Sequence, residues 1–461
     1  MPHIYISAAH KSSGKTTVSL GIGAALKQRG HSVQPFKKGP DYIDPIWLQA
    51  ATGRPCFNLD FNTQTHDEIK DCFASHLGDS QLALIEGNKG LYDGMDRDGS
   101  DCNAAMAKLL DAPVILVLDS HGITRNAAPL LLGLQQFDKE VNIAGVILNK
   151  TAGGRHESKL KAVIEHYTDI PILGAIQRHS DLHIDERHLG LMPSNETSEA
   201  NRIIERIANR VAQSVDLDAI LRIAEQTVIA PLKTDNDKPK GEPFRLGIAR
   251  DAAFGFYYPD DIEAFKNSGA EIVTFDTLKD DKLPVIDALF IGGGFPETQL
   301  EALHANNSML DSIKTAIDSG MPAYAECGGL MYLTRSIQWG DKKLDMAGVI
   351  PADSLMHDHA IGRGYTLYSP TRDHPWNMLE FAPQTPIHAH EFHYSSLENI
   401  AAESSYAYEV SRGAGISNNM DGICHNNLIA TYIHQRQTKQ NLWVDAFCSF
   451  IQQQLQTTNT H

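Results

Sequence analysis

The segment AAHKSSGKTT, residues 8–17, constrains the fold of this chain more than any other feature of its sequence. The apolar stretch HIYIS precedes it, and a helical pattern from about Thr16 to Gln28, ended by Gly30, follows it. Ala9-x-x-x-x-Gly14-Lys15-Thr16 therefore fits a phosphate-binding P-loop, with alanine in place of the first glycine. The alternative is an ordinary glycine-containing turn with a surface lysine, which the flanking strand and helix disfavour.

A P-loop predicts a nucleotide site, which we take to be for ATP. Backbone N–H groups and the helix N-terminus would bind the phosphates, Lys15 would neutralise the β and γ oxygens, and the Thr16 hydroxyl would bind Mg²⁺. The predicted ATP-binding residues are Ser12, Ser13, Gly14, Lys15, Thr16, Thr17 and Asn149. Asn149 closes the apolar run IAGVILN and could read an adenine edge, although a turn-forming asparagine is the commoner explanation.

Four carboxylates follow predicted strands that converge on the P-loop. Asp41 and Asp44 lie in KKGPDYIDP, Glu86 ends the strand LALI at the position of a Walker-B acid, and Asp93 follows in GLYDG. Because Mg²⁺ is usually held by one or two carboxylates with phosphate oxygens and water, we expect Thr16, Asp44 and Glu86 to bind it. Each acid alone could equally be a solvated loop carboxylate or a helix cap.

The order of apolar runs predicts two α/β domains. Strands alternate with helical segments through residue 225, as in βαβ units of a parallel sheet, and the acids and P-loop lie at the edge that normally binds ligands. The charged, proline- and glycine-containing stretch around residues 228–243 predicts a linker between a first domain at 1–227 and a second at 244–461. The predicted strands are His3–Ser7, Val33–Phe36, Leu82–Ile85, Pro113–Asp119, Ile143–Asn149, Ile172–Ile176, Leu246–Ala249, Ile272–Phe275, Ala288–Ile291 and Ala323–Glu326.

The second domain carries a candidate cysteine nucleophile. The strand ending at Glu326 runs into Cys327-Gly328-Gly329 and then a helical pattern, which would present the thiol at the sheet edge beside helix N–H groups. His434 follows the apolar run LIATYI and is the candidate base. Gly293, Gly294 and Gly328 offer amides that could bind an oxyanion and glutamine. Together these features predict a glutaminase, with the other cysteines as small buried hydrophobic residues.

Histidines also gather in HAHEFHYS, at positions 388, 390 and 393. Alternating positions on a strand share a face, which raises a metal-binding hypothesis. We disfavour it because no further ligand cluster accompanies them, and imidazoles can equally orient an anionic substrate.

Composition narrows the class of protein. The apolar fraction of 42% is ordinary for a globular chain, and the formal net charge of −17 disfavours nucleic acid or an anionic membrane as a partner. The six cysteines form no CxxC pair, which indicates a reducing compartment. Since no apolar stretch reaches transmembrane length and no signal peptide is visible, we expect a cytoplasmic protein.

The two sites have a joint chemical logic. Phosphorylation turns a poorly reactive carboxylate into an acyl phosphate that ammonia can attack. Because ammonia is mostly protonated in neutral water, releasing it from glutamine within the same protein is useful. We therefore predict an ATP-dependent amidase of carboxylates fed by glutamine.

Several long motifs support a more specific interpretation: SSGKTT, KKGPDYIDP, EGNKGLYDG, the RHLGL run, ARDAAFGFYYPD, GGGFPE, AECGGLMYL and HEFHYS. With them, the sequence resembles the cobyrinate a,c-diamide synthases over nearly its whole length. The resemblance implies a dethiobiotin-synthetase-like ATP domain joined to a cobyric-type class I glutamine amidotransferase domain. It also implies ATP- and Mg²⁺-dependent amidation of the a and c acetates of cobyrinic acid, with Cys327 as nucleophile and His434 as base. The family typically lacks the third, acidic member of the triad, and Gln435-Arg436 after His434 agrees with this.

Departures from the family pattern leave the macrocycle open. Ser13 replaces a common glycine, and Asn88-Lys89 replaces the usual apolar pair after the Walker-B-like acid. Sirohaem, sirohydrochlorin or its nickel complex would undergo the same chemistry, and Lys11 and Lys89 would favour such a polycarboxylate. Lys37, Asp41 and Asp93 are further candidates for contacts with substrate or phosphate.

Two other classes are weighed against this one. A regulatory or partitioning P-loop ATPase with a non-catalytic second domain is disfavoured by Cys327 and His434. A cobyric-acid-type synthase acting on other corrin amides is disfavoured by KGPDYIDP and EFHYS. A homodimer is expected only by analogy.

Overall fold

The chain divides into two compact units, Met1–Thr234 and Asp235–His461. The computed structural model describes residues 2–179, 184, 186–187, 190–196, 199–227, 229–230, 232, 241–376 and 385–458. The division falls within the predicted linker, most of which lies outside the described residues, so the domain boundaries stay a prediction. The RHLGL run also lies partly outside them. None of the described helices is long and apolar enough to cross a membrane.

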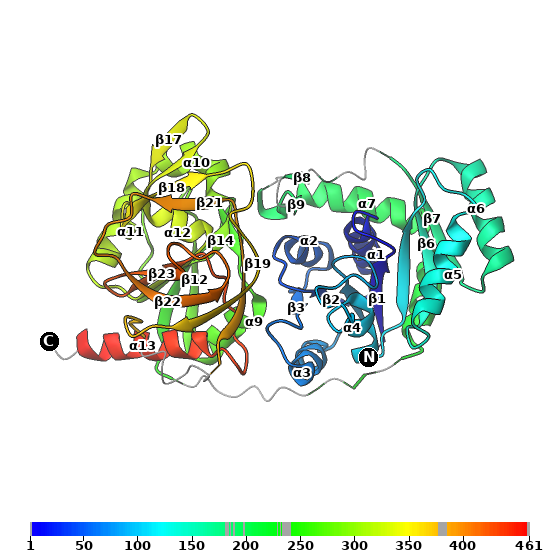
Figure 1. Cartoon of the computed structure of the whole chain (residues 1–461), viewed down its shortest axis with the longest axis horizontal. Coiled ribbons are helices and arrows are strands. Elements are labelled where there is room, and N and C mark those ends of the chain that lie inside the picture. The colour runs from blue at the N-terminus through cyan, green and yellow to red at the C-terminus, as the bar shows by residue number, and fades with distance from the viewer. Residues whose placement is uncertain are drawn as a thin grey trace. The chain divides into compact units, whose positions relative to one another are not determined.

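The first unit is built on a seven-stranded sheet in the order β3-β2-β4-β1-β5-β6-β7 (Figure 1). Every neighbouring pair in it is parallel. Its strands are β1 (His3–Ala8), β2 (Val33–Lys38), β3 (Phe57–Leu59), β4 (Leu82–Glu86), β5 (Val114–Asp119), β6 (Ile143–Thr151) and β7 (Ile172–Gln177). The six strands predicted for this unit are confirmed to within two residues at each end, and β3 was not predicted.

Helices cover both faces of this sheet. They are α1 (Lys15–Gln28), α2 (Ile43–Thr52), α3 (His66–His76), α4 (Asn103–Leu109), α5 (Ala127–Phe137), α6 (Gly154–Tyr167), α7 (Ala200–Ser214) and α8 (Leu217–Ala224). Successive side chains of β1 point to opposite faces, so Ile4 and Ile6 join the core under α1, while Tyr5 joins the core on the other face. A parallel sheet buried on both faces needs such near-continuous apolar strands.

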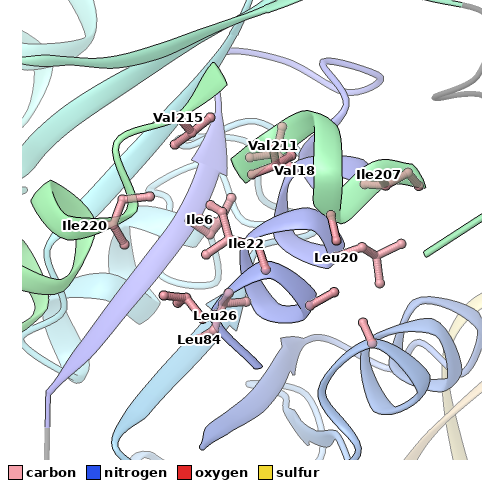
Figure 2. Close-up of a cluster of buried hydrophobic side chains, with 14 of the residues drawn as sticks. Ile6, Val18, Leu20, Ile22, Leu26, Leu84, Ile207, Val211, Val215 and Ile220 are labelled. Atoms are coloured by element: carbon pink, nitrogen blue, oxygen red, sulfur yellow. The ribbon is translucent and has the colours of Figure 1, made fainter. Parts of the chain in front are cut away.

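Close packing of α1 against α7 fixes the helix that follows the P-loop. The buried residues of α7 follow a helical period, and Figure 2 shows its Val211 beside Val18 of α1. A Cβ atom at Gly21 would lie 2.3 Å from Cγ2 of Val211. Glycine at this position therefore permits the close approach of the two helices.

The second unit contains a nine-stranded sheet in the order β12-β10-β13-β15-β24-β23-β22-β19-β20. The first five strands are parallel and the rest antiparallel. The parallel strands are β12 (Ala270–Phe275), β10 (Phe244–Ala249), β13 (Ala288–Ile291), β15 (Ala323–Glu326) and β24 (Leu428–Thr431). The antiparallel ones are β23 (Met420–His425), β22 (Ser405–Arg412), β19 (Gly362–Pro370) and β20 (Ile387–His393). The four strands predicted here are confirmed, whereas the antiparallel half was not predicted.

Helices again cover the two faces: α9 (Pro259–Asn267), α10 (Leu300–Ala305), α11 (Asn307–Asp318), α12 (Gly328–Leu333) and α13 (Trp443–Thr458). A four-stranded sheet adds β17 (Lys342–Asp345), β16 (Thr334–Trp339), β18 (Ile350–Met356) and β21 (Ser395–Glu398). A two-stranded pair joins β11 (Phe254–Phe256) to β14 (Gly293–Gly294). The predicted α/β class is confirmed in both units.

Candidate functional site

The P-loop joins β1 to α1, in the middle of the first sheet. Ser12 and Gly14 have positive φ angles, 65° and 88°, which turn the chain sharply before the helix. A Cβ atom at Gly14 would lie 2.3 Å from Nδ2 of Asn149, so the position has no room for a side chain. As N-cap residue, Gly14 cannot cap the helix with a side chain either. The first N–H groups of α1 are therefore placed to bind an anion such as phosphate.

Lys15 opens α1 and is 5% exposed. Burial and repulsion from Lys37 lower its pKa to about 8, against the attraction of Glu86, Asp44 and Asp93. Its ammonium group is thus incompletely compensated by its surroundings. An incoming polyphosphate would supply the missing negative charge.

Three of the predicted acids surround one buried lysine. The Nζ atom of Lys37 lies 2.5 Å from Asp44, 2.9 Å from Glu86 and 3.7 Å from Asp41. The Thr16 hydroxyl donates to Glu86 at 2.8 Å and is 3.3 Å from Asp44. The structure therefore brings together residues from α1, β2, α2 and β4, as expected from the strand ends. Lys37 itself is 2% exposed and does not face solvent.

The cluster fits a divalent cation. Although burial opposes it, the ammonium of Lys37 and hydrogen bonds hold the pKa of Asp44 below its usual value, so this acid is charged. Oε2 of Glu86 is buried and has no hydrogen-bond partner within the described part of the chain. Thr16, Asp44 and Glu86 thus offer oxygen ligands of the kind that Mg²⁺ takes together with phosphate oxygens and water. Their role as metal ligands stays a prediction.

The remaining candidates for substrate contact differ in their surroundings. Asp41 accepts the first two backbone N–H groups of α2, at 2.9 and 3.2 Å, and so also holds the start of that helix. Asp93 accepts the N–H of Gly90 at 3.1 Å and closes a turn. Lys11 and Lys89 are exposed. Contacts of these four side chains with a substrate stay predictions.

Asn149 and its neighbour brace the P-loop from β6. The side-chain amide of Asn149 donates to the carbonyl of Ser13 at 2.9 Å and accepts the N–H of Lys150 at 3.0 Å. Lys150, with a φ of 58°, donates to the carbonyl of Ser12 and to Asp119, both at 2.8 Å. Neither Lys150 nor Asp119 was predicted from the sequence. The adenine contact suggested for Asn149 stays a prediction.

Cys327 lies on the sharp turn between β15 and α12. Its φ of 48° and ψ of −100° are unusual for a residue with a side chain, and such strain often marks a functional position. Its backbone N–H donates to Thr431 of the adjacent strand at 2.7 Å. Its sulfur is 4.0 Å from the carbonyl of Phe392 at the end of β20. The predicted placement of a thiol on a strand-to-helix turn is therefore confirmed.

His434 lies at the same edge of the second sheet. The apolar run before it forms β24, which ends at Thr431, and His434 instead forms an isolated antiparallel bridge with His390. Its N–H donates to the His390 carbonyl at 2.8 Å, and the two rings stack with centroids 4.9 Å apart. A Cβ atom at Gly293 would lie 2.9 Å from Cε1 of His434. The ring is thus held by β20 on one side and by the glycine turn on another.

The predicted oxyanion glycines also gather here. A Cβ atom at Gly328 would lie 2.9 and 3.0 Å from the backbone oxygen and nitrogen of Gly294, and one at Gly294 would lie 2.0 Å from the carbonyl oxygen of Ala253. Both positions therefore require glycine. Gly328 additionally donates its N–H to the Cys327 sulfur. Binding of an oxyanion or glutamine by Gly293, Gly294 and Gly328 stays a prediction.

The resting thiol is neutral. Burial raises the pKa of Cys327 far above its ordinary value, and the negative charges of Glu297 and Glu326 raise it further, against the lowering effect of the Gly328 N–H. A thiol in such surroundings needs a base that accepts its proton as it attacks. His434, at the same edge of the sheet, is the candidate for this base, and the role stays a prediction.

The resemblance implied a site without an acidic third member, but an acid does lie beside His434. Oε2 of Glu326, the residue before the nucleophile, lies 3.2 Å from Nδ1 of His434. Glu326 is 2% exposed. A signal was available, because an acid ending an otherwise apolar strand is unusual, but nothing local linked it to a histidine 108 residues away.

The three histidines of HAHEFHYS do not share one face. On β20, His388 is exposed and His390 is buried against His434. The side chain of His393 points to the opposite face of the strand. Its Nδ1 donates to the carbonyl of Ser395 at 2.7 Å, and its ring stacks on Tyr432. Across the described ranges, no three His, Cys, Asp or Glu side chains are arranged to hold a metal ion alone.

The P-loop site lies at an edge of the first sheet, and the site of Cys327 and His434 lies at an edge of the second. Together they define a class of enzyme in which a nucleotide-binding unit is joined to a glutamine amidotransferase unit. Residues 5–191 match the family model of the CobQ/CobB/MinD/ParA nucleotide binding domain, and residues 245–441 match that of the CobB/CobQ-like glutamine amidotransferase domain. The chain belongs to the cobyrinate a,c-diamide synthase family.

Relatives from distant organisms match almost end to end. A cobyrinate a,c-diamide synthase of Magnetococcus marinus is 43% identical over 443 residues, covering 94% of each chain. Those of Methanosarcina barkeri and Listeria innocua are 39% and 38% identical, covering 94% of this chain and 92% and 96% of theirs. The resemblance seen in the sequence motifs, and the assignment to glutamine-dependent ligases, are confirmed.

Proposed function

We propose that this protein amidates the a and c acetate groups of cobyrinic acid, using ATP and ammonia released from glutamine. The observation that carries the proposal is the pairing of a P-loop with a buried Cys–His site in a chain 43% identical to a cobyrinate a,c-diamide synthase. We further propose that the reaction takes place in the cytoplasm. The six cysteines are all free, which suits a reducing compartment.

In the first unit, the substrate carboxylate attacks the γ-phosphorus of ATP, and the bond to the β,γ-bridging oxygen breaks to give an acyl phosphate and ADP. Lys15 and the N–H groups of the P-loop bind the phosphates throughout. Thr16, Asp44 and Glu86 would hold Mg²⁺, which neutralises charge on the phosphate oxygens when it is bound. Lys37 keeps the acids of this cluster oriented.

In the second unit, the Cys327 sulfur attacks the carboxamide carbon of glutamine while His434 accepts the thiol proton. His434 then gives this proton to the leaving nitrogen, so ammonia departs and a thioester remains. Water hydrolyses the thioester to glutamate and restores the thiol. The ammonia attacks the acyl phosphate, and phosphate leaves as the amide forms.

The test is to incubate the protein with ATP, Mg²⁺ and glutamine, separately with cobyrinic acid, sirohaem, sirohydrochlorin and nickel sirohydrochlorin, and to weigh the products. We expect two amide groups added to cobyrinic acid. Addition only to another tetrapyrrole would refute the proposed substrate while keeping the chemistry. No ATP turnover with any of them, even with saturating ammonium salts, would refute the proposed reaction.

Two variants separate the half-reactions. Cys327→Ala should lose glutamine-driven amidation and keep activity with free ammonium, because only the ammonia source is removed. Lys15→Ala should lose amidation with both nitrogen donors, since no acyl phosphate forms. Full glutamine-driven turnover by the cysteine variant would show that the nucleophile is wrongly assigned.

A further inference from the structure

We infer that Glu326 positions His434 for proton transfer with Cys327 and thereby serves as the acidic member of a Cys–His–Glu triad. The inference rests on the proposed glutaminase activity. The acid of this triad does not come from the chain segment after His434, which holds Gln435 and Arg436. It comes from the residue immediately before the nucleophile.

The second oxygen of the Glu326 carboxylate is firmly held. Oε1 accepts the hydroxyl of Tyr324 and the backbone N–H of Gln435, each at 3.0 Å. The amide of Gln435 in turn donates to the hydroxyls of Tyr324 and Tyr408 at 2.8 and 3.0 Å. A buried carboxylate is costly unless donors surround it, and this one has donors on both oxygens. Its orientation is therefore fixed by the core of the second unit.

This carboxylate sets the proton arrangement of His434. The Nδ1 atom lies 3.2 Å from Oε2, so it donates its proton to Glu326. Nε2 then carries the lone pair and is the nitrogen that would act as the base, as in other triads. Stacking on His390 orients the ring, and a Cβ atom at Gly293 would lie only 2.9 Å from Cε1, so little space is left on that side.

Charge supports the same role. The buried, neutral thiol transfers its proton to Nε2 as the bond between sulfur and the glutamine carbon forms. The imidazolium produced at this moment is stabilised by the negative Glu326, which keeps its hydrogen bond and does not take the proton itself. When the C–N bond breaks, Nε2 returns the proton to the leaving ammonia.

The decisive variant is Glu326→Gln, which preserves size but removes the charge and can present an N–H to Nδ1. We expect kcat for glutamine hydrolysis to fall about 10²–10⁴-fold, as when a triad acid is replaced elsewhere. KM for glutamine should change less than about threefold, because Glu326 lies behind the histidine and not in contact with substrate. Amidation with ammonium should persist.

Two further variants separate positioning from general damage. Glu326→Asp keeps the charge and should recover at least part of the lost kcat. Glu391→Gln is the matched control, since Glu391 is a buried carboxylate of β20 whose oxygens accept the N–H groups of Ala414 and Gly415 at 2.5 and 3.3 Å. We expect its effect on kcat to stay below about fivefold.

The pH profile provides a readout that a purely structural role would not move. Without the carboxylate, the acid side of the kcat/KM profile should shift to lower pH, because the protonated imidazole loses its partner. Wild-type kcat and an unchanged profile in Glu326→Gln would overturn the inference. An equal loss in Glu391→Gln, with no recovery in Glu326→Asp, would also overturn it. Absence of glutamine hydrolysis in the wild type would instead refute the proposed function.

Discussion

Replacing Lys37 with methionine should destabilise the first unit far more than the second. Methionine matches the length of the stem but leaves three acids without their cation. Asp44 and Glu86 lie 2.5 and 2.9 Å from Nζ, and Asp41 lies at 3.7 Å. Glu86 is fully buried, so it cannot recover hydration in place of the lost partner.

The expected cost follows from this geometry. Removing one partner of a buried ion pair typically costs about 3–5 kcal/mol, because the other charge stays buried and unpaired. For a unit of this size, each kcal/mol lowers the melting temperature by about 2–4 °C. We therefore expect the melting temperature of the first unit to fall by roughly 6–20 °C, with no change in the second. Native-state hydrogen exchange resolves the two units by peptide, so the second serves as internal control.

The loss of folding stability in the Lys37 variant should become smaller as the pH is lowered. In the variant, burial and mutual repulsion raise the pKa of each acid above its unfolded value, so stability is recovered as pH falls through the folded values. In the wild type, burial and Asp44 raise the pKa of Asp41 to about 7, and burial raises that of Glu86. The quantity to measure is therefore the difference in the free energy of unfolding between wild type and variant. It should be measured from pH 7 to pH 5 without divalent cations.

A loss below about 1 kcal/mol at pH 7, or a loss that grows on acidification, would refute the view that Lys37 neutralises this cluster. Equal destabilisation of both units would indicate general misfolding.

Three further predictions concern the same unit. Because the pKa of Lys15 is lowered to about 8, ATP should bind about tenfold more weakly at pH 9 than at pH 7 by calorimetric titration, and a flat profile would contradict this. The depressed pKa also means that charged Lys15 costs stability below about pH 8, so Lys15→Met should stabilise the unliganded unit at pH 7 and lose this advantage by pH 10. Gly21→Ala should cost about 1–3 kcal/mol in thermal unfolding, since its Cβ meets Val211. Gly133→Ala on α5, where a Cβ meets nothing within 4 Å, should instead be neutral or stabilising, and similar losses in both would refute the packing argument.

Local patterns in the sequence predicted much of this protein. A strand, a Gly-Lys-Thr turn and a helix are specified by neighbouring residues, so the P-loop and α1 could be placed to within one residue. The position of the Cys327 thiol on a strand-to-helix turn could also be predicted from neighbouring residues alone. The acids Asp44 and Glu86 could be assigned to one site because parallel strands bring their carboxyl ends to the same edge.

The partners within each site were decided by the tertiary structure. Lys150 reaches Ser12 across 138 residues, and Glu326 reaches His434 across 108. Both contacts depend on which strands are neighbours and in which register, as in the pairing of Glu326 with Thr431 between β15 and β24. The sequence by itself determined the elements and the chemical groups at their ends. Only the fold determined which groups meet, because strand order is a property of the whole sheet and of no single segment.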